Sequence, residues 1–78
     1  MKIKEMSKNQ IVEQLYKPCY LKKVNSDLTE TILYKITTDR NKISYQNIET
    51  LEIKNTPISL FLFLLEKKYP DAILTQII

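Results

Sequence analysis

The sequence predicts a small α+β domain, and three observations lead to this prediction. One stretch of eleven residues alternates apolar and polar side chains as a strand does, two stretches space apolar residues as a helix does, and the chain has only 78 residues. A chain of this length buries about 60% of its unfolded surface, so its core is small. We expect a single domain over residues 1–78, ordered as helix, antiparallel hairpin or three-stranded sheet, helix, and a short C-terminal strand or helix.

The first helix is expected at about residues 7–17. Ser7 and Gln10 have the spacing of a capping box, in which each residue satisfies a free backbone N–H of the other. Pro18 then ends the helix, because proline disrupts a helix interior. Residues 1–6 either extend this helix or form a flexible arm. The apolar stripe of the helix consists of Ile11, Val12, Leu15 and Tyr16.

Residues 28–38 form the strongest strand candidate in the chain. The segment is rich in Thr, Ile and Tyr, which favour strands, and it follows a short extended segment at 19–24 and a turn at 25–27. Strict alternation places one set of side chains on one face of the sheet. That predicted set is Leu28, Glu30, Ile32, Tyr34 and Ile36.

A hairpin loop at residues 39–42 follows, and the chain then returns. Because the chain has no glycine, Asn41 or Asp39 is the expected residue for any positive-φ position in this loop. The alternation of the return strand slips near residues 46–50, which indicates a bulge or a tight turn. We expect either two short strands, at about 43–46 and 50–54 with Leu51 and Ile53 on the same face as Tyr45, or one bent strand.

The most apolar stretch runs from residue 58 to residue 65. It is too short to span a membrane, which takes about 20 residues. Thr56 as cap, Pro57 in the first turn and Pro70 beyond the end favour a helix at 57–69. Residues 71–78 form a strand in our preferred interpretation and a short helix in the alternative. The main apolar stripe of the helix consists of Ile58, Phe61, Leu62, Leu65 and Tyr69.

This helix carries more apolar side chains than one stripe requires. In one interpretation the sheet and the first helix cover all of them. In the other, part of the surface stays exposed and binds a partner protein or a second copy of the chain, since exposed apolar patches mark interaction sites. The predicted protein interface consists of Leu60, Phe63, Leu64 and Lys67.

The residue inventory argues against catalysis. The chain has no histidine, no glycine and one cysteine, Cys19. These absences remove the commonest general base, ordinary zinc sites and glycine-rich phosphate loops. The sequence therefore predicts a protein that is not an enzyme and has no metal site and no cofactor. The single cysteine and the polar N-terminus predict an intracellular, cytoplasmic protein.

A modest positive charge raises an alternative function. The net charge is +3, and basic residues occur in pairs. If these pairs converge on one face, they contact nucleic-acid phosphates. Against this, eleven of the twelve basic residues are lysines, whereas arginine is the preferred bidentate reader of phosphates and bases. The candidate nucleic-acid contacts are Lys22, Lys23, Arg40 and Lys42.

The order helix, three strands, helix over residues 7–69 is similar to that of the double-stranded-RNA-binding domain. In that family the second helix opens with a glycine- and lysine-rich phosphate-binding segment. Here the same place reads TPISLFLFLL. The residues that would carry the family's function are therefore missing, and we assign the chain to no family.

The composition and the apolar second helix together predict the function class. Ile and Lys occur eleven times each and Ala once, as in AT-rich coding sequences of low-GC bacteria, their phages and plasmids, and some parasites and viruses. The chain resembles anti-CRISPR proteins, antitoxins and similar anti-defence proteins in size and in its lack of catalytic residues. We expect a small protein-binding module of phage or mobile-element type that inhibits or modulates a larger host protein. The alternatives are a small basic nucleic-acid-binding regulator and a structural subunit of a larger assembly.

Overall fold

One antiparallel sheet organises the computed structural model, which describes residues 1–77. The sheet has five strands in the order β4-β3-β2-β1-β5, where three strands and an optional fourth were predicted. Four strands precede the second helix, so the predicted order of helix, three strands, helix is only partly matched. The strands are β1 (Cys19–Val24), β2 (Glu30–Asp39), β3 (Lys42–Asn47), β4 (Ile53–Pro57) and β5 (Ile73–Gln76).

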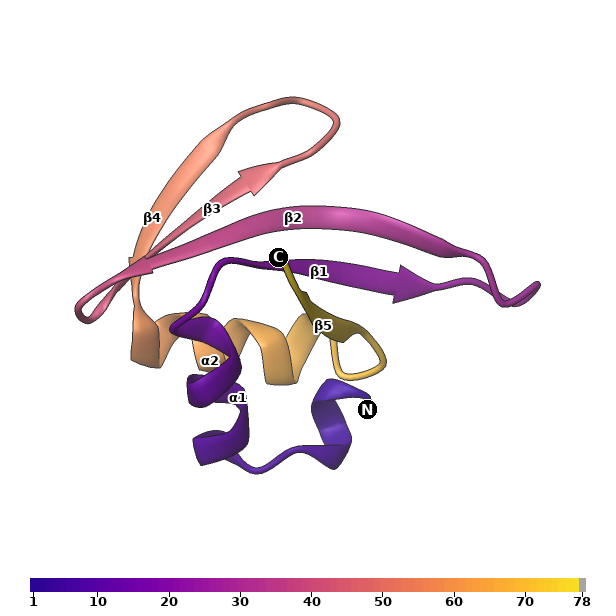
Figure 1. Cartoon of the computed structure of the whole chain (residues 1–78), viewed down its shortest axis with the longest axis horizontal. Helices are drawn as coiled ribbons and strands as arrows, with labels where there is room; N and C mark the ends of the chain where they lie inside the picture. The colour runs from indigo at the N-terminus through magenta and orange to yellow at the C-terminus, as the bar shows by residue number, and fades with distance from the viewer. Residues whose placement is uncertain (78) are drawn as a thin grey trace.

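The helices cover one face of this sheet. Figure 1 shows the sheet curving over the helices, with the β3–β4 hairpin rising away from them. The opposite face carries no helix among residues 1–77. The helical elements are the 3₁₀ turn η1 (Ile3–Glu5), α1 (Lys8–Leu15) and α2 (Ile58–Lys68).

Helix α1 begins at the predicted cap. The Ser7 hydroxyl accepts from the Gln10 N–H at 3.2 Å, and the Gln10 side chain accepts from the Ser7 N–H at 2.8 Å, so the capping box is confirmed. The helix ends at Leu15, two residues before the predicted end. There the Thr38 hydroxyl of β2 donates to the Leu15 carbonyl, which satisfies one of the free acceptors at the helix end.

The N-terminal residues pack on the core, where the sequence predicted a helix extension or an arm. Ile3 is fully buried, and its N–H donates to the Ala72 carbonyl at 2.9 Å. The Lys4 N–H donates to the Pro70 carbonyl at 2.9 Å, and the Lys4 ammonium lies 2.8 Å from the Asp71 carboxylate. These contacts join the start of the chain to the turn between α2 and β5.

A bulge divides the faces of β2 differently from the sequence prediction. Leu21 of β1 lies opposite Tyr34, but the next residue, Lys22, lies opposite Ile32, so Leu33 has no partner. A bulge of this kind changes the phase of the alternation. Leu33 packs against the core, whereas Ile32 is exposed. The prediction that Ile32 shares a face with Tyr34 is therefore wrong.

The β2–β3 loop has two residues, and its positive φ falls on an unexpected one. Asp39 pairs with Lys42, and Arg40 has φ 58°, whereas Asn41 or Asp39 was predicted for this conformation. Tight hairpin loops need residues with positive φ to match the twist of the strands. Without glycine, Arg40 bears the steric cost of this conformation.

A tight turn separates β3 from β4, so the return segment forms two short strands and not one bent strand. The second of these strands begins at Ile53, three residues later than predicted. The Asn47 side-chain oxygen accepts from the N–H groups of Glu49 and Thr50, at 2.9 and 3.0 Å. β4 then continues to Pro57, which caps α2 through its backbone alone. Thr56 therefore lies in the strand and does not cap the helix as predicted.

The buried side chains form one cluster between the sheet and the helices. Burial raises the pKa of the Cys19 thiol in this cluster to about 11, because the thiolate would lose its hydration. Of the segment 71–78, for which the sequence favoured a strand, residues 73–76 form one, and residue 78 lies outside the described residues. The buried apolar residues are Ile3, Ile11, Leu15, Cys19, Leu21, Ile36, Ile43, Phe61, Leu65 and Ala72.

Candidate functional site

Helix α2 buries apolar side chains on one side and leaves others exposed on another side. Phe61 and Leu65 are fully buried under the sheet, and the Phe61 ring lies 5.1 Å from that of Tyr45 in β3. Leu60 and Phe63 keep 60% and 59% of their surface exposed. The interpretation in which the sheet and α1 cover every apolar side chain of this helix is therefore wrong.

Four residues of α2 form what we call the apolar flank: Leu60, Phe63, Leu64 and Lys67. Their spacing of three and four residues places them side by side on the helix surface. Leu64 is half-buried and joins the flank to the core. The polar residues Ser59 and Glu66 lie four and three residues from Phe63, so they border the flank on one side. The flank itself is apolar apart from Lys67.

Lys67 gives the flank a positive charge. Its ammonium nitrogen lies 5.6 Å from the centre of the Phe63 ring, within the range of a cation–π contact. Lys68 follows it at the end of the helix and is also exposed. A partner that covers Phe63 must therefore also accommodate a cation.

The exposed area indicates which part of an interface the flank can form. An aromatic side chain can bury about 150–250 Å², so Phe63 leaves roughly 100 Å² to be covered. Covering this area gains about 2.5 kcal/mol at roughly 25 cal/mol per Å². A stable protein interface buries about 800 Å² on each partner. The flank therefore has the size of an energetic centre within a larger interface.

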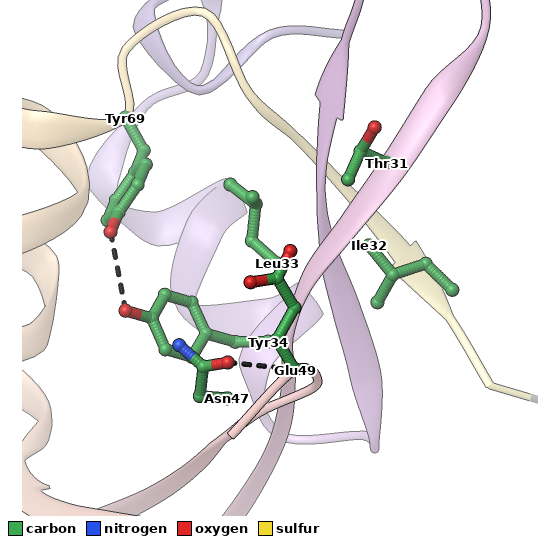
Figure 2. Close-up of a pocket in the computed structure, with 7 residues that line it drawn as sticks. All are labelled: Thr31, Ile32, Leu33, Tyr34, Asn47, Glu49 and Tyr69. Atoms are coloured by element: carbon green, nitrogen blue, oxygen red, sulfur yellow. Dashed lines mark hydrogen bonds between the residues drawn. The ribbon is translucent and has the colours of Figure 1, made fainter. Parts of the chain in front are cut away.

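The structure also contains a tyrosine-lined pocket that sequence reasoning missed. Figure 2 shows Tyr34 of β2 and Tyr69 at the end of α2 pointing toward one another, with their hydroxyl oxygens 3.5 Å apart. Burial and this hydrogen bond raise the pKa of Tyr69 to about 12. Leu33 at the bulge and Asn47 before the β3–β4 turn also line the pocket. Only the tertiary fold brings these elements together, so no sequence signal could have located the pocket.

The pocket is better explained by packing than by ligand binding. The rings of Tyr34 and Tyr45 pack edge to face at 5.2 Å, and those of Tyr34 and Tyr69 at 6.1 Å, so the tyrosines contact one another. The volume is about 240 Å³, below the roughly 300–1,000 Å³ of typical ligand pockets. We therefore do not treat this tyrosine-lined pocket as the candidate site, and we place that site on the apolar flank because of its exposed Leu60 and Phe63.

The structure separates the basic residues that were predicted to contact nucleic acid. Lys22 and Lys23 lie near the β1–β2 turn, whereas Arg40 and Lys42 lie at the β2–β3 turn, at the opposite end of β2 (Figure 1). A ten-residue strand such as β2 spans roughly 30 Å. Lys22 also lies 3.4 Å from the Glu30 carboxylate, which offsets its charge. The two pairs do not form one basic patch.

In comparisons with known proteins, no protein-family model, no curated protein and no solved structure matches the chain. Within residues 1–77, no helix has both the length and the apolar character that crossing a membrane takes.

Proposed function

We propose that the chain is a small, non-enzymatic protein-binding module that docks through the apolar flank of α2. The supporting observation is the contrast within one helix. Phe61 is fully buried, yet Phe63, two residues away, and Leu60 leave more than half of their surface in solvent. Large apolar side chains that are exposed next to one another mark interaction sites more often than isolated ones do.

The chemistry of the flank specifies the kind of surface that it fits. Leu60 and Phe63 fit an apolar groove on a partner. Lys67 and Lys68 would pair with carboxylates at the rim of that groove. The net charge of +3 would steer the chain toward such an acidic surface. We therefore propose a larger, acidic-rimmed protein as the partner, which the chain inhibits or modulates by occupying its surface.

The AT-rich composition supports a phage or mobile-element setting for this activity. In that setting, the small α+β domain would belong to the class of anti-defence inhibitors. The nucleic-acid-binding alternative receives less support, because its four basic residues lie at two ends of the sheet.

The proposal is tested by comparing variants in a pull-down. The parent chain, Phe63→Glu and the control Asn9→Glu are immobilised and exposed to lysate of the source cell at high salt. Asn9→Glu adds the same charge at an exposed position of α1 and leaves the flank of α2 intact. We expect the parent and Asn9→Glu to retain a common protein that Phe63→Glu loses, because an unpaired carboxylate in an apolar groove is costly.

Circular dichroism and thermal unfolding of each variant are measured to check that it remains folded. Equal retention by all three chains, or retention of nucleic acid alone that is released by salt, would contradict the proposed docking surface.

A further inference from the structure

The sheet has two edges, and among residues 1–77 only the β5 edge is partly covered. Beside β5, Lys2 forms an isolated bridge with Ile73, and the Ile3 N–H donates to the Ala72 carbonyl. The outer side of β4 has no such cover among residues 1–77. An uncovered edge presents unpaired N–H and C=O groups to any other extended chain.

The hydrogen-bond pattern identifies which backbone groups of β4 are free. The Asn47 N–H donates to the Glu52 carbonyl, and the Ile58 N–H donates to the Asn41 carbonyl. Bonded and non-bonded pairs alternate along an antiparallel ladder. Between those two bonds, the backbones of Lys54 and Thr56 therefore face β3. The backbone N–H and C=O groups of Ile53 and Asn55 face outward.

The side chains around this free edge are complementary to those of the same edge in a second copy of the chain. Ile53 is 58% exposed, and it lies between Glu52 and Lys54. These two charged residues are exposed, and neither takes part in an ion pair among residues 1–77. An acid and a base at equal distances from a central apolar residue match the same segment running in the opposite direction.

We infer that β4 is the dimerisation edge of the chain and that its occupant is a second copy paired antiparallel about Ile53. In this register Ile53 lies opposite the partner subunit's Ile53, and the two exchange both of their free backbone hydrogen bonds. Lys54 lies opposite the partner subunit's Glu52, and the symmetry repeats this pair. Opposite charges and apolar pairs across strands are favourable.

The charge of Lys54 disfavours the nearest competing register of the strand pair. Centring the pair on Lys54 would place two lysines directly opposite one another, which is unfavourable. At its far end the free edge is closed by Pro57, which has no N–H to donate. Pairing therefore stays short, and the dimer joins two sheets into one whose outer edges are the partly covered β5 strands. Such an isologous contact is closed, so it does not propagate into fibres.

The test is a charge swap followed by sedimentation analysis from micromolar to millimolar protein. We expect the parent to dimerise, and Lys54→Glu and Glu52→Lys each to weaken the dimer about tenfold, because each places like charges opposite one another twice. The double variant, Lys54→Glu with Glu52→Lys, restores opposite charges and should recover the affinity to within a few fold. A fully monomeric parent, or a double variant as weak as the single ones, overturns the inference.

A backbone substitution supplies an independent check. Ile53→Pro removes the outward N–H at the centre of the pair, while Ile53→Ala keeps it, and both lose the exposed Ile53 side chain. We expect Ile53→Pro to weaken the dimer more than Ile53→Ala does. Dissociation by Phe63→Glu, with no effect of the β4 variants, would assign the contact to the apolar flank and overturn the inference. The pull-down with α2 variants remains a separate test, so either proposal can fail alone.

Discussion

At the scale of single residues, position on α2 matters more than residue type. Phe61 and Phe63 are identical side chains two positions apart, yet one is fully buried against Tyr45 and the other contacts Lys67 in solvent. The helical repeat of 3.6 residues places them on opposite sides of α2. One phenylalanine therefore stabilises the fold, and the other remains available for binding.

This contrast predicts very different costs for the same substitution. We expect Phe61→Ala to lower the free energy of unfolding by about 3–5 kcal/mol, since it removes buried area and leaves a cavity. Phe63→Ala should lower it by about 1 kcal/mol or less, because more than half of the Phe63 side chain is already in solvent. Urea titration followed by circular dichroism measures both values. Losses of equal size would show that Phe63 is part of the core in solution.

At the scale of elements, the N-terminal turn η1 is bound to the fold by polar contacts as well as by Ile3. The Lys4 ammonium holds the pKa of the Asp71 carboxyl below its ordinary value, through a hydrogen bond and through its charge. The Asp71 carboxylate in turn raises the pKa of Lys4. This ion pair connects the first element of the chain to the turn that precedes the last strand.

The lowered pKa predicts how acid affects this connection. A carboxyl whose pKa falls on folding stabilises the fold above its unfolded value of about 4, and this contribution is lost as the pH falls through the folded value. We expect the parent to lose stability below about pH 4 more steeply than Asp71→Asn, as measured by urea midpoints at several pH values. Glu13→Gln, at an exposed position on α1, is the control and should follow the parent.

At the scale of the whole molecule, the arrangement of charge distinguishes the two leading functions. The basic pairs lie at opposite ends of a strand that spans roughly 30 Å. Each end can neutralise about two phosphates, and binding to DNA then falls with salt with a logarithmic slope of about −2.

This slope is measurable by titrating duplex DNA at several salt concentrations. We expect weak binding with a slope near −2, and we expect Lys42→Gln to change it little, because the other end can still bind. A slope steeper than about −4 would require both ends to act together and would favour the nucleic-acid-binding alternative.

The sequence located the elements that depend on neighbouring residues. The capping box of Ser7 and Gln10, the strand predicted at 28–38 and the apolar helix between Pro57 and Pro70 are all local patterns. The structure confirms them, with the strand at Glu30–Asp39. The excess of apolar residues on α2 is also visible in the sequence, and it predicts the exposed Leu60 and Phe63 on which our proposed docking surface rests.

The sequence alone could not assign the faces of the sheet. The bulge at Leu33 moved Ile32 out of the core, and the β3–β4 turn placed Ile53 opposite Gln46, away from the face of Tyr45 that the sequence assigned to it. A shift of one residue exchanges the two faces of a strand.

What the sequence by itself determined is therefore the type of each main element and the surplus of apolar surface on α2. Only the tertiary structure decided which side chains remain in solvent and which edge of the sheet is free. The physical reason is that helix and strand propensities act between residues close in the chain. Strand register and burial depend on contacts between residues far apart in sequence, such as Leu21 with Tyr34 and Phe61 with Tyr45.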